Sequence, residues 1–207
     1  MGWFDEPGAW SRYNATQQDR PPRPLVQELL EHAGDGGGRL ALDLGYGGGV
    51  ETALLLRRGW RVLAIDGDPV AAASLRARLP TGRLTIETRD FADLDALPEL
   101  HVVHAAWSLP YAGRHLPRLW DLLLSALVPG GWLACDLFGE RDTTADAEDI
   151  ARLTDDEVDR FLTRLDVVHR DTQEVDGTAF GGPQHWHVHS VVARRPPTVQ
   201  VPGSSTG

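Results

Sequence analysis

The chain has 207 residues, 42% of them hydrophobic and 24% charged, which is long enough for one hydrophobic core and short for two domains. Its formal net charge of −10 opposes generic binding to nucleic acid or to an anionic membrane, because phosphate binding requires a cationic surface. The single cysteine, Cys135, permits no intrachain disulfide and fits a reducing compartment. The sequence shows no signal-peptide pattern and no apolar run of membrane-spanning length, so we expect a cytoplasmic protein.

Three segments are expected along the chain. Residues 1–38 form an N-terminal lid with a helix near 23–32, residues 39–195 form the main domain, and residues 196–207 form a disordered tail rich in Pro, Gly, Ser and Thr. Strand and helix patterns alternate in the main domain. This alternation predicts an α/β fold, with a Rossmann-like, seven-stranded, mainly parallel sheet, helices on both faces and an antiparallel last strand. The expected strands are 39–44, 61–66, 83–88, 101–106, 132–137, 164–171 and 186–194, and the expected helices of this domain are 49–58, 69–79, 114–127 and 154–163.

The most informative pattern is a strand that ends in an acid and runs into a glycine turn. The apolar run ends at Asp43, and Gly45, Gly47 and Gly49 follow before a helical pattern begins. Glycines let the backbone approach a ligand closely, and the start of a helix adds unpaired N–H groups. The second strand ends in Asp66, a position suited to holding ribose hydroxyls. This arrangement predicts a site for a nucleoside-containing cofactor.

The acid beside the turn indicates which cofactor binds. Asp43 would repel a pyrophosphate, whereas it suits the ammonium and sulfonium groups of S-adenosylmethionine. Here the sequence resembles the class I S-adenosylmethionine-dependent methyltransferases, whose first motif, D/E-x-G-x-G-x-G, matches residues 43–49. Their later motifs match residues 62–66, 89–91 and 127–133.

The resemblance narrows to small bacterial methyltransferases near the tellurite-resistance type. The segments that carry it are Tyr13 with residues 20–23, then residues 108–110, 137–142 and 185–187. Together they span roughly residues 10–195. These motifs are specific for the fold and the cofactor, and they do not specify the substrate.

The resemblance implies a set of cofactor contacts. Asp66 would accept hydrogen bonds from the ribose, Asp43 would orient the methionine end, and Asp90 would accept from the adenine amino group. Asp90 can also be a simple helix or turn cap, because Asp is common there. The expected cofactor-binding residues are Asp43, Gly45, Gly47, Gly49, Asp66, Gly67, Asp90, Phe91 and Ala106.

Three residues are candidates for catalysis. Asp136 ends the fifth expected strand and can be a general base with a raised pKa, or a structural partner of an arginine. His185 is a candidate for proton transfer, and Trp107 can line the reacting methyl group or simply cover the sheet edge. The segment at Trp107 lacks the Asn/Asp-Pro-Pro-Tyr/Phe motif of DNA and glutamine methyltransferases, so planar amino groups of that kind are disfavoured.

Four further residues are candidates for substrate binding, and no metal is expected. His185, His187 and His189 share one strand face, but no cysteine or carboxylate pair accompanies them, so sheet packing competes with a functional role. Arg23 can bind an anionic group of the substrate. The expected substrate-binding residues are Tyr13, Arg23, Ser108 and His187.

The sequence therefore predicts methyl transfer from S-adenosylmethionine to a small-molecule acceptor, with S-adenosylhomocysteine as product, in bacterial specialised metabolism. One alternative is a methyltransferase-like enzyme that catalyses a cyclisation or elimination, with the cofactor structural or absent. Another is a non-catalytic subunit that binds the cofactor and supports a partner. A homodimer or a protein partner is possible, and neither nucleic acid nor membrane is expected as a partner.

Overall fold

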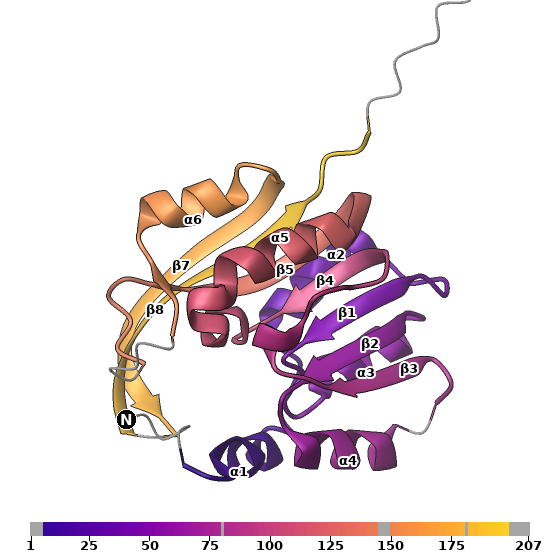
Figure 1. The fold of residues 1–207 in the computed structure, drawn as a ribbon, viewed down its shortest axis with the longest axis horizontal. Helices are drawn as coiled ribbons and strands as arrows, with labels where there is room; N and C mark the ends of the chain where they lie inside the picture. Colours follow the sequence, from indigo (N-terminus) through magenta and orange to yellow (C-terminus); the bar gives the residue numbers. More distant parts are fainter. Residues whose placement is uncertain (1–5, 80, 145–149, 181, 199–207) are drawn as a thin grey trace, which may run out of the picture.

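The computed structural model describes residues 6–79, 81–144, 150–180 and 182–198. These residues form one twisted sheet in the order β3-β2-β1-β4-β5-β8-β7, with β6 paired to β5 beside this path (Figure 1). Neighbours from β3 to β5 are parallel, and β8 runs antiparallel to both β5 and β7. The strands are β1 (Leu40–Leu44), β2 (Arg61–Asp66), β3 (Leu84–Thr88), β4 (Leu100–Ala105), β5 (Leu127–Gly139), β6 (Arg152–Leu153), β7 (Asp166–Ala179) and β8 (Gly182–Arg194).

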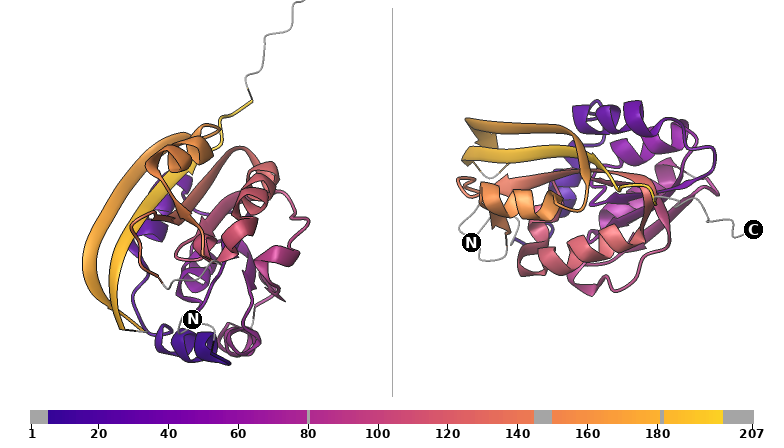
Figure 2. Two further views of the ribbon diagram at one scale, coloured as in Figure 1. Left: turned by 60° about the vertical axis from the view of Figure 1, so that its left-hand side comes forward. Right: turned by 90° about the horizontal axis from the view of Figure 1, so that it is seen from above.

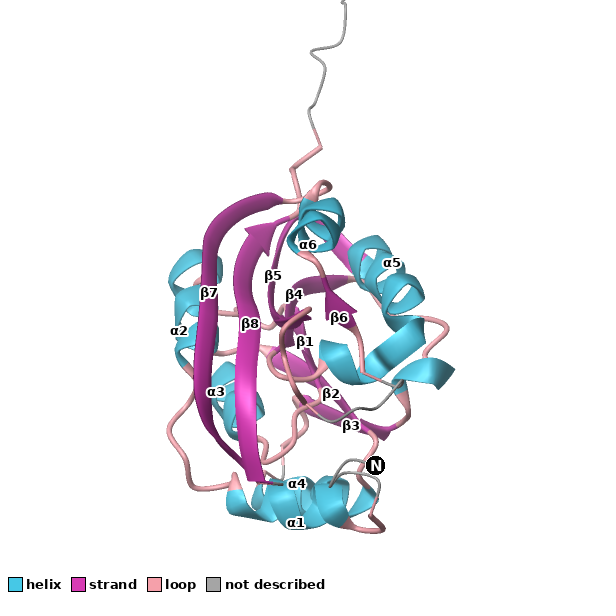
Figure 3. Ribbon diagram, turned by 90° about the vertical axis from the view of Figure 1, so that its left-hand side faces the viewer, coloured by secondary structure: helices cyan, strands magenta, loops and turns pink. Residues whose placement is uncertain are grey.

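Helices cover both faces of the sheet (Figure 3). One buried cluster joins α2, α3 and α4 to one face, and another joins α5 and α6 to the opposite face. This two-sided cover explains why the central strands read as nearly continuous apolar runs. The helices are α1 (Ala9–Thr16), α2 (Pro24–Ala33), α3 (Val50–Arg57), α4 (Pro69–Arg78), α5 (Leu116–Ala126) and α6 (Asp155–Leu162), with short 3-10 helices η2 (Phe91–Asp93) and η3 (Leu109–His115).

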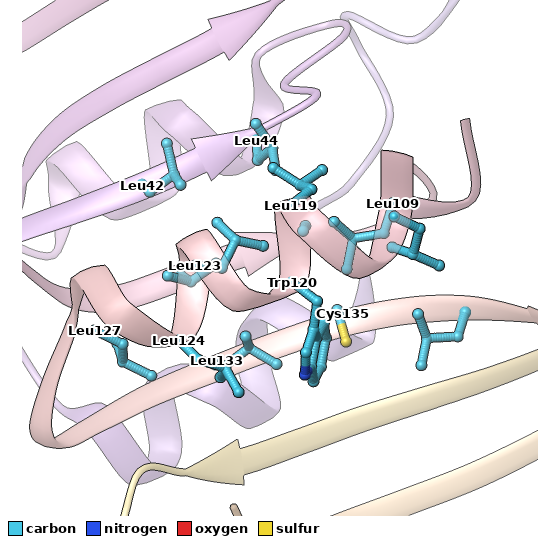
Figure 4. Close-up of a cluster of buried hydrophobic side chains, with 14 of the residues drawn as sticks. Leu42, Leu44, Leu109, Leu119, Trp120, Leu123, Leu124, Leu127, Leu133 and Cys135 are labelled. Atoms are coloured by element: carbon cyan, nitrogen blue, oxygen red, sulfur yellow. The ribbon is translucent and has the colours of Figure 1, made fainter. Parts of the chain in front are cut away.

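The core on the α5 face follows from the apolar periodicity of that helix. Its leucines recur at helical spacing and pack on β1, β4 and β5, where Cys135 is a buried core residue (Figure 4). Trp120 packs in the same cluster and donates its indole N–H to the carbonyl of Phe161. Leu127, expected at the end of the helix, instead begins β5. The buried residues contributed by α5 are Leu116, Leu119, Trp120, Leu123 and Leu124.

The predicted α/β class, the parallel sheet and the helices on both faces are confirmed, and three details differ. The two-residue strand β6 makes the sheet eight-stranded, and α1 was not expected. The last two strands, β7 and β8, form a hairpin that is longer than predicted and curves away from the other strands of the sheet (Figure 2). Most residues of β7 are exposed, so its sequence carries no apolar alternation that would mark a strand.

Within the segment predicted as a lid, helix α2 packs on the domain. Leu25, Val26 and Leu29 of α2 are buried against the same face of the sheet as α3 and α4. Residues 199–207 of the predicted tail lie outside the described residues. Among the described helices, none has the length and apolar character needed to cross a bilayer.

Truncation of the α5 core is expected to destabilise the protein. Leu123→Ala removes a fully buried side chain and leaves a cavity, so we expect a loss of about 2–5 kcal/mol in the free energy of unfolding. Val70→Ala is the control, because Val70 is 59% exposed and its truncation should change stability by no more than about 0.5 kcal/mol. Urea denaturation followed by circular dichroism measures both variants, and equal midpoints would contradict this account of the core.

Candidate active site

A cavity of about 860 Å³ opens at the carboxyl ends of β1, β2 and β4. The chain reverses its strand order between β1 and β4, which is the position where open α/β sheets bind their ligands. The wall is built from the glycine turn after β1, the ends of β2 and β4, the N-terminal helix α1 and the tip of the β7–β8 hairpin. The cavity therefore joins segments from both ends of the chain.

The turn after β1 admits only very small side chains. Gly45 has a positive φ of 71°, and a Cβ at this position would lie 2.3 Å from the Cβ of Ser108. Gly47 also has a positive φ, of 48°, and its N–H donates to Asp66 at 2.9 Å. Glycine is thus required both by backbone conformation and by packing. The resulting turn exposes its backbone to the cavity.

Asp66 and Asp68 organise the opposite side of this turn. The two oxygens of the Asp66 carboxylate accept the backbone N–H groups of Gly47 and Asp68, both at 2.9 Å. Burial raises the pKa of Asp66, although these two hydrogen bonds work against the shift. Asp68 caps α4 by accepting from the backbone N–H of Val70. Both aspartates line the cavity.

Asp43 forms a buried pair with a histidine on the neighbouring strand. Asp43 and His104 are register partners in β1 and β4, and the imidazole Nδ1 lies 2.9 Å from a carboxylate oxygen. The other oxygen accepts from the hydroxyl of Thr52. Nε2 of His104 is buried without a hydrogen-bond partner among the described residues, and His104 lines the cavity. Buried polar atoms are normally hydrogen-bonded, so this nitrogen marks a position where a ligand can bind.

The charge state of His104 follows from its surroundings. Burial alone would lower its pKa. The hydrogen bond and charge of Asp43, together with the charges of Glu51 and Asp136, outweigh burial and raise the pKa above the usual 6.5. His104 is therefore poised to carry a proton that it can share with a bound molecule.

A second ion pair, which is partly buried, fixes the N-terminal segment. Arg20 makes a two-pronged contact with Glu51 in the first turn of α3, at 2.6 and 2.7 Å, and the backbone N–H of Arg23 donates to the same carboxylate. Burial alone would raise the pKa of Glu51, but the hydrogen bond from Arg20, with help from His104 and the Arg23 backbone, lowers it to about 2. The contact ties the chain just before α2 to the edge of the cavity.

Helix α1 covers the glycine turn. Asn14 and Ser11 donate hydrogen bonds to the two oxygens of Asp68, at 3.1 and 2.7 Å. A Cβ at Gly48 would lie 2.8 Å from the backbone of Gln17, so the segment after the helix presses on the turn itself. Figure 1 shows α1 beside α4 at the base of the molecule. The first helix is thus a wall of the site, and the lid expected in this segment stays a prediction.

Trp107 has an unusual backbone conformation just after β4. Its φ of 55° lies in the left-handed region, which bulky residues rarely adopt and which often accompanies function. Its N–H donates to Asp136 at 3.1 Å, and Ser190 donates to the other oxygen of that carboxylate. Burial raises the pKa of Asp136, while the Ser190 hydrogen bond, the charges of His104 and Arg23 and the N–H of Trp107 lower it. These contacts make Asp136 a support for Trp107.

The predicted catalytic acid and histidines lie outside the cavity. Asp136 is buried beneath Trp107, and its role as a base stays a prediction that its contacts do not favour. His185 pairs with Asp176 and Glu174 on the outer face of the hairpin. The pKa of His185 is raised, mainly by its hydrogen bond with Asp176. His187 is buried, and both of its ring nitrogens lie against Arg141.

The three strand histidines do share one face of β8, and that face points away from the cavity. With Asp155, His187 and His189 form a group whose potential ligand atoms lie within 4.8 Å of one another. The Arg141 guanidinium lies 3.2 Å from Nε2 of His187, and a cation there opposes a metal ion. Trp186, on the other face of the same strand, lines the cavity instead.

The remaining predicted residues have mixed placements. Tyr13, Arg23, Phe91 and Ala106 line the cavity, as do Trp107 and Gly67. Asp90 also lines it and caps η2 by accepting from the backbone of Ala92, so both readings of this residue have a structural basis. Ser108 lines it too, although its hydroxyl donates to the carbonyl of Leu44. Gly49 packs against Leu75 and is not among the described lining residues.

Comparisons with known proteins agree with this architecture. Residues 41–131 match the family described as "Methyltransferase domain". The trans-aconitate 2-methyltransferase of Methylobacterium radiotolerans is 36% identical over 137 residues, which cover 63% of this chain and 48% of the relative. The chain spans about half the length of the trans-aconitate 2-methyltransferases that it matches.

Two solved structures share the fold. TehB from Haemophilus influenzae superposes with a TM-score of 0.72 at 12% identity, covering 90% of this chain and 67% of TehB. The 1,6-didemethyltoxoflavin-N1-methyltransferase of Burkholderia thailandensis, solved with bound 1,6-didemethyltoxoflavin and S-adenosylhomocysteine, has a TM-score of 0.67 at 21% identity, covering 93% of this chain and 86% of that one.

The strand order and the glycine turn between two acids give a Rossmann-like fold, and residues 41–131 of it match a methyltransferase domain. The resemblance to class I S-adenosylmethionine-dependent methyltransferases that residues 43–49 and 62–66 carry is confirmed.

The Arg20–Glu51 pair should make stability sensitive to acid. The pKa of Glu51 is lowered in the folded state, so its contribution is complete above the ordinary value of 4.5 and is lost as pH falls toward 2. Glu51→Gln removes the counter-charge of the partly buried Arg20, which should cost about 1.5–3 kcal/mol at pH 7 and flatten the acid dependence. Denaturant melts at several pH values, with the exposed Glu31→Gln as control, measure this difference. Parallel pH profiles for the Glu51 variant and the wild-type protein would contradict it.

The His104 pair predicts a measurable protonation shift. His104 should titrate above 6.5 in NMR spectra. Asp43→Asn should lower the pKa of His104, because the negative charge that offsets the effect of burial is then removed. Since the folded pKa is raised, the stabilisation is present below 6.5 and is lost as pH rises through the folded pKa. His185 is the internal control, because its partners Asp176 and Glu174 are untouched. A His104 titration that Asp43→Asn leaves in place would contradict the assignment.

Proposed function

We propose that this chain transfers a methyl group from S-adenosylmethionine to a small-molecule acceptor inside the cavity. The observation that carries the proposal is the placement of Asp43 and Asp66 on adjacent parallel strands, on the cavity wall, around the glycine turn. A cavity of about 860 Å³ lies within the size range of small-molecule sites and favours such an acceptor over a macromolecule.

The polar half of the cavity suits an adenosyl amino acid. S-adenosylmethionine supplies a methyl group carried on a positively charged sulfur. The Asp66 oxygens already accept one N–H each and keep further lone pairs for ribose hydroxyls. Gly67 offers room beside them, because a Cβ there would meet no atom within 4 Å. Asp90 and Phe91 lie along the same wall and are proposed to contact the adenine.

Catalysis would rest mainly on alignment in a covered site. Methyl transfer requires the acceptor atom, the methyl carbon and the sulfur in line, and holding them together supplies a large part of the rate enhancement. Helix α1, fixed by Asp68 and by the Arg20–Glu51 pair, excludes water from that alignment. His104 is the proposed proton-handling residue, since its Nε2 can donate to a bound oxygen when protonated and accept a proton when neutral.

Removing the ribose acceptor should weaken cofactor binding. Asp66→Ala eliminates a carboxylate proposed to accept hydrogen bonds, which is worth about 1.5–3 kcal/mol, so the dissociation constant for S-adenosylhomocysteine should rise about 10- to 100-fold. Isothermal titration calorimetry measures it. Asp93→Ala is the matched control, because Asp93 is exposed and is not among the residues lining the cavity.

The same preparation tests methyl transfer through release of S-adenosylhomocysteine with candidate acceptors. A folded wild-type protein that gives no heat with either S-adenosylmethionine or S-adenosylhomocysteine would overturn the proposal. Turnover of an acceptor that persists without S-adenosylmethionine would instead support the cyclisation or elimination alternative. A place in specialised metabolism, a cytoplasmic location and a homodimer or protein partner stay predictions from the sequence.

A further inference from the structure

We propose that the acceptor is a planar aromatic or heteroaromatic molecule that carries a single anionic group. This inference deepens the proposed methyl transfer and rests on it. It comes from the half of the cavity that the cofactor motifs do not explain. That half is lined by aromatic side chains, which we call the aromatic wall: Trp10, Tyr13, Trp107, Tyr111, Phe180 and Trp186.

The aromatic wall is assembled from three separate parts of the chain. Trp107 and Trp186 meet edge to face with ring centroids 4.9 Å apart, which joins the end of β4 to β8. Trp10 meets Tyr111 in the same way at 4.8 Å, which joins α1 to η3. Aromatic pairs favour this geometry, in which the edge of one ring meets one face of the other and the remaining faces are left for further contact. Such a wall selects for a flat ring by shape.

Trp107 is held more firmly than packing alone would require. Its backbone is in the left-handed region, and the buried Asp136 carboxylate anchors its N–H while Ser190 anchors the carboxylate. Strain of this kind persists only where the surroundings impose it. Phe138 packs under the indole at 5.8 Å and completes the support. A large aromatic side chain is therefore presented rigidly at the rim of strand β4, where a reacting acceptor would lie.

Arg23 is the positively charged side chain that would pair with the anionic group of the acceptor. Its guanidinium carbon lies 5.4 Å from the centre of the Trp107 ring, and the side chain lines the cavity. It forms no ion pair within the described part of the chain, whereas Arg20 is engaged by Glu51 and Arg89 lies near Glu87 and Asp95. A guanidinium over an aromatic ring binds a carboxylate or phenolate oxygen well while the ring of the same ligand stacks beside it.

The balance of charges around the whole cavity argues against a polyanionic acceptor. Carboxylates outnumber arginines among the lining residues, so several negative charges on one ligand would meet repulsion. The lining carboxylates are Glu6, Asp43, Glu51, Asp66, Asp68 and Asp90, and the lining arginines are Arg20, Arg23 and Arg89. One anionic group paired with Arg23 is compatible with this balance.

Paired ligands test the inference on the wild-type protein saturated with S-adenosylhomocysteine. Calorimetry compares benzoate and quinoline-2-carboxylate with cyclohexanecarboxylate, which has the same charge and no flat ring, and with trans-aconitate, a flexible polyacid. We expect the aromatic acids to bind at least about tenfold more tightly than the other two. Trp186→Leu, also measured at saturating S-adenosylhomocysteine, should remove most of this preference. Trp132→Leu, which alters a half-buried tryptophan stacked on His32 outside the cavity, should keep the preference.

The outcomes separate this inference from the proposed function. If S-adenosylhomocysteine binds but trans-aconitate or cyclohexanecarboxylate binds as tightly as the aromatic acids, the aromatic class is wrong and methyl transfer stands. If S-adenosylhomocysteine itself does not bind, both proposals fall. The ligand comparison on the wild-type protein is decisive even if Trp186→Leu does not fold.

Discussion

The site depends on an ion pair between the buried Glu51 and the partly buried Arg20. The carboxylate lies in the first turn of α3, directly after the glycine turn, and the arginine lies in the segment that connects α1 to α2. Two hydrogen bonds from the Arg20 side chain and one from the backbone of Arg23 fix this segment to the start of α3. Charges removed from water are stable only when paired in this way, so the contact specifies one position for the N-terminal segment. Helix α1 then has to pass over the glycine turn.

The cavity that this segment borders has two chemically different halves. Near β1 and β2 the wall is polar, with carboxylates and exposed backbone that suit a nucleoside and an amino acid. Near β4 and the β7–β8 hairpin it is aromatic, and its rings are contributed by segments far apart in sequence. His104 stands between the halves on β4, paired with Asp43 of β1. The division places a proton-handling group beside the position proposed for the reacting atoms.

The fold and the polar half could be predicted from sequence because their signals are local. An apolar run, an acid and spaced glycines occur within a few residues, and their ligand geometry follows from strand, turn and helix alone. His104 was not predicted, because its importance depends on the register that brings it beside Asp43. The alternation of residues along β8 predicts that its three histidines share one face. The sequence does not indicate which face of β8 meets the cavity. The prediction therefore favoured His185 and His187, whereas Trp186 lines the cavity.

Asp136 shows a different limit of sequence reasoning. A carboxylate near the end of a strand suggests a base, and burial does raise its pKa. Its hydrogen bonds to Trp107 and Ser190, however, link residues far apart in the sequence, and they can be recognised only once β5 and β8 are paired. The unexpected length of the hairpin has a similar cause, since an exposed outer strand needs no apolar pattern.

A crystal structure of the protein with S-adenosylhomocysteine tests the central claim most directly. The account predicts the ribose hydroxyls at the Asp66 carboxylate, the sulfur directed toward Trp107 and Trp186, and α1 closed over the glycine turn. A nucleoside bound elsewhere, or bound in this cavity with its ribose away from Asp66, would contradict the account.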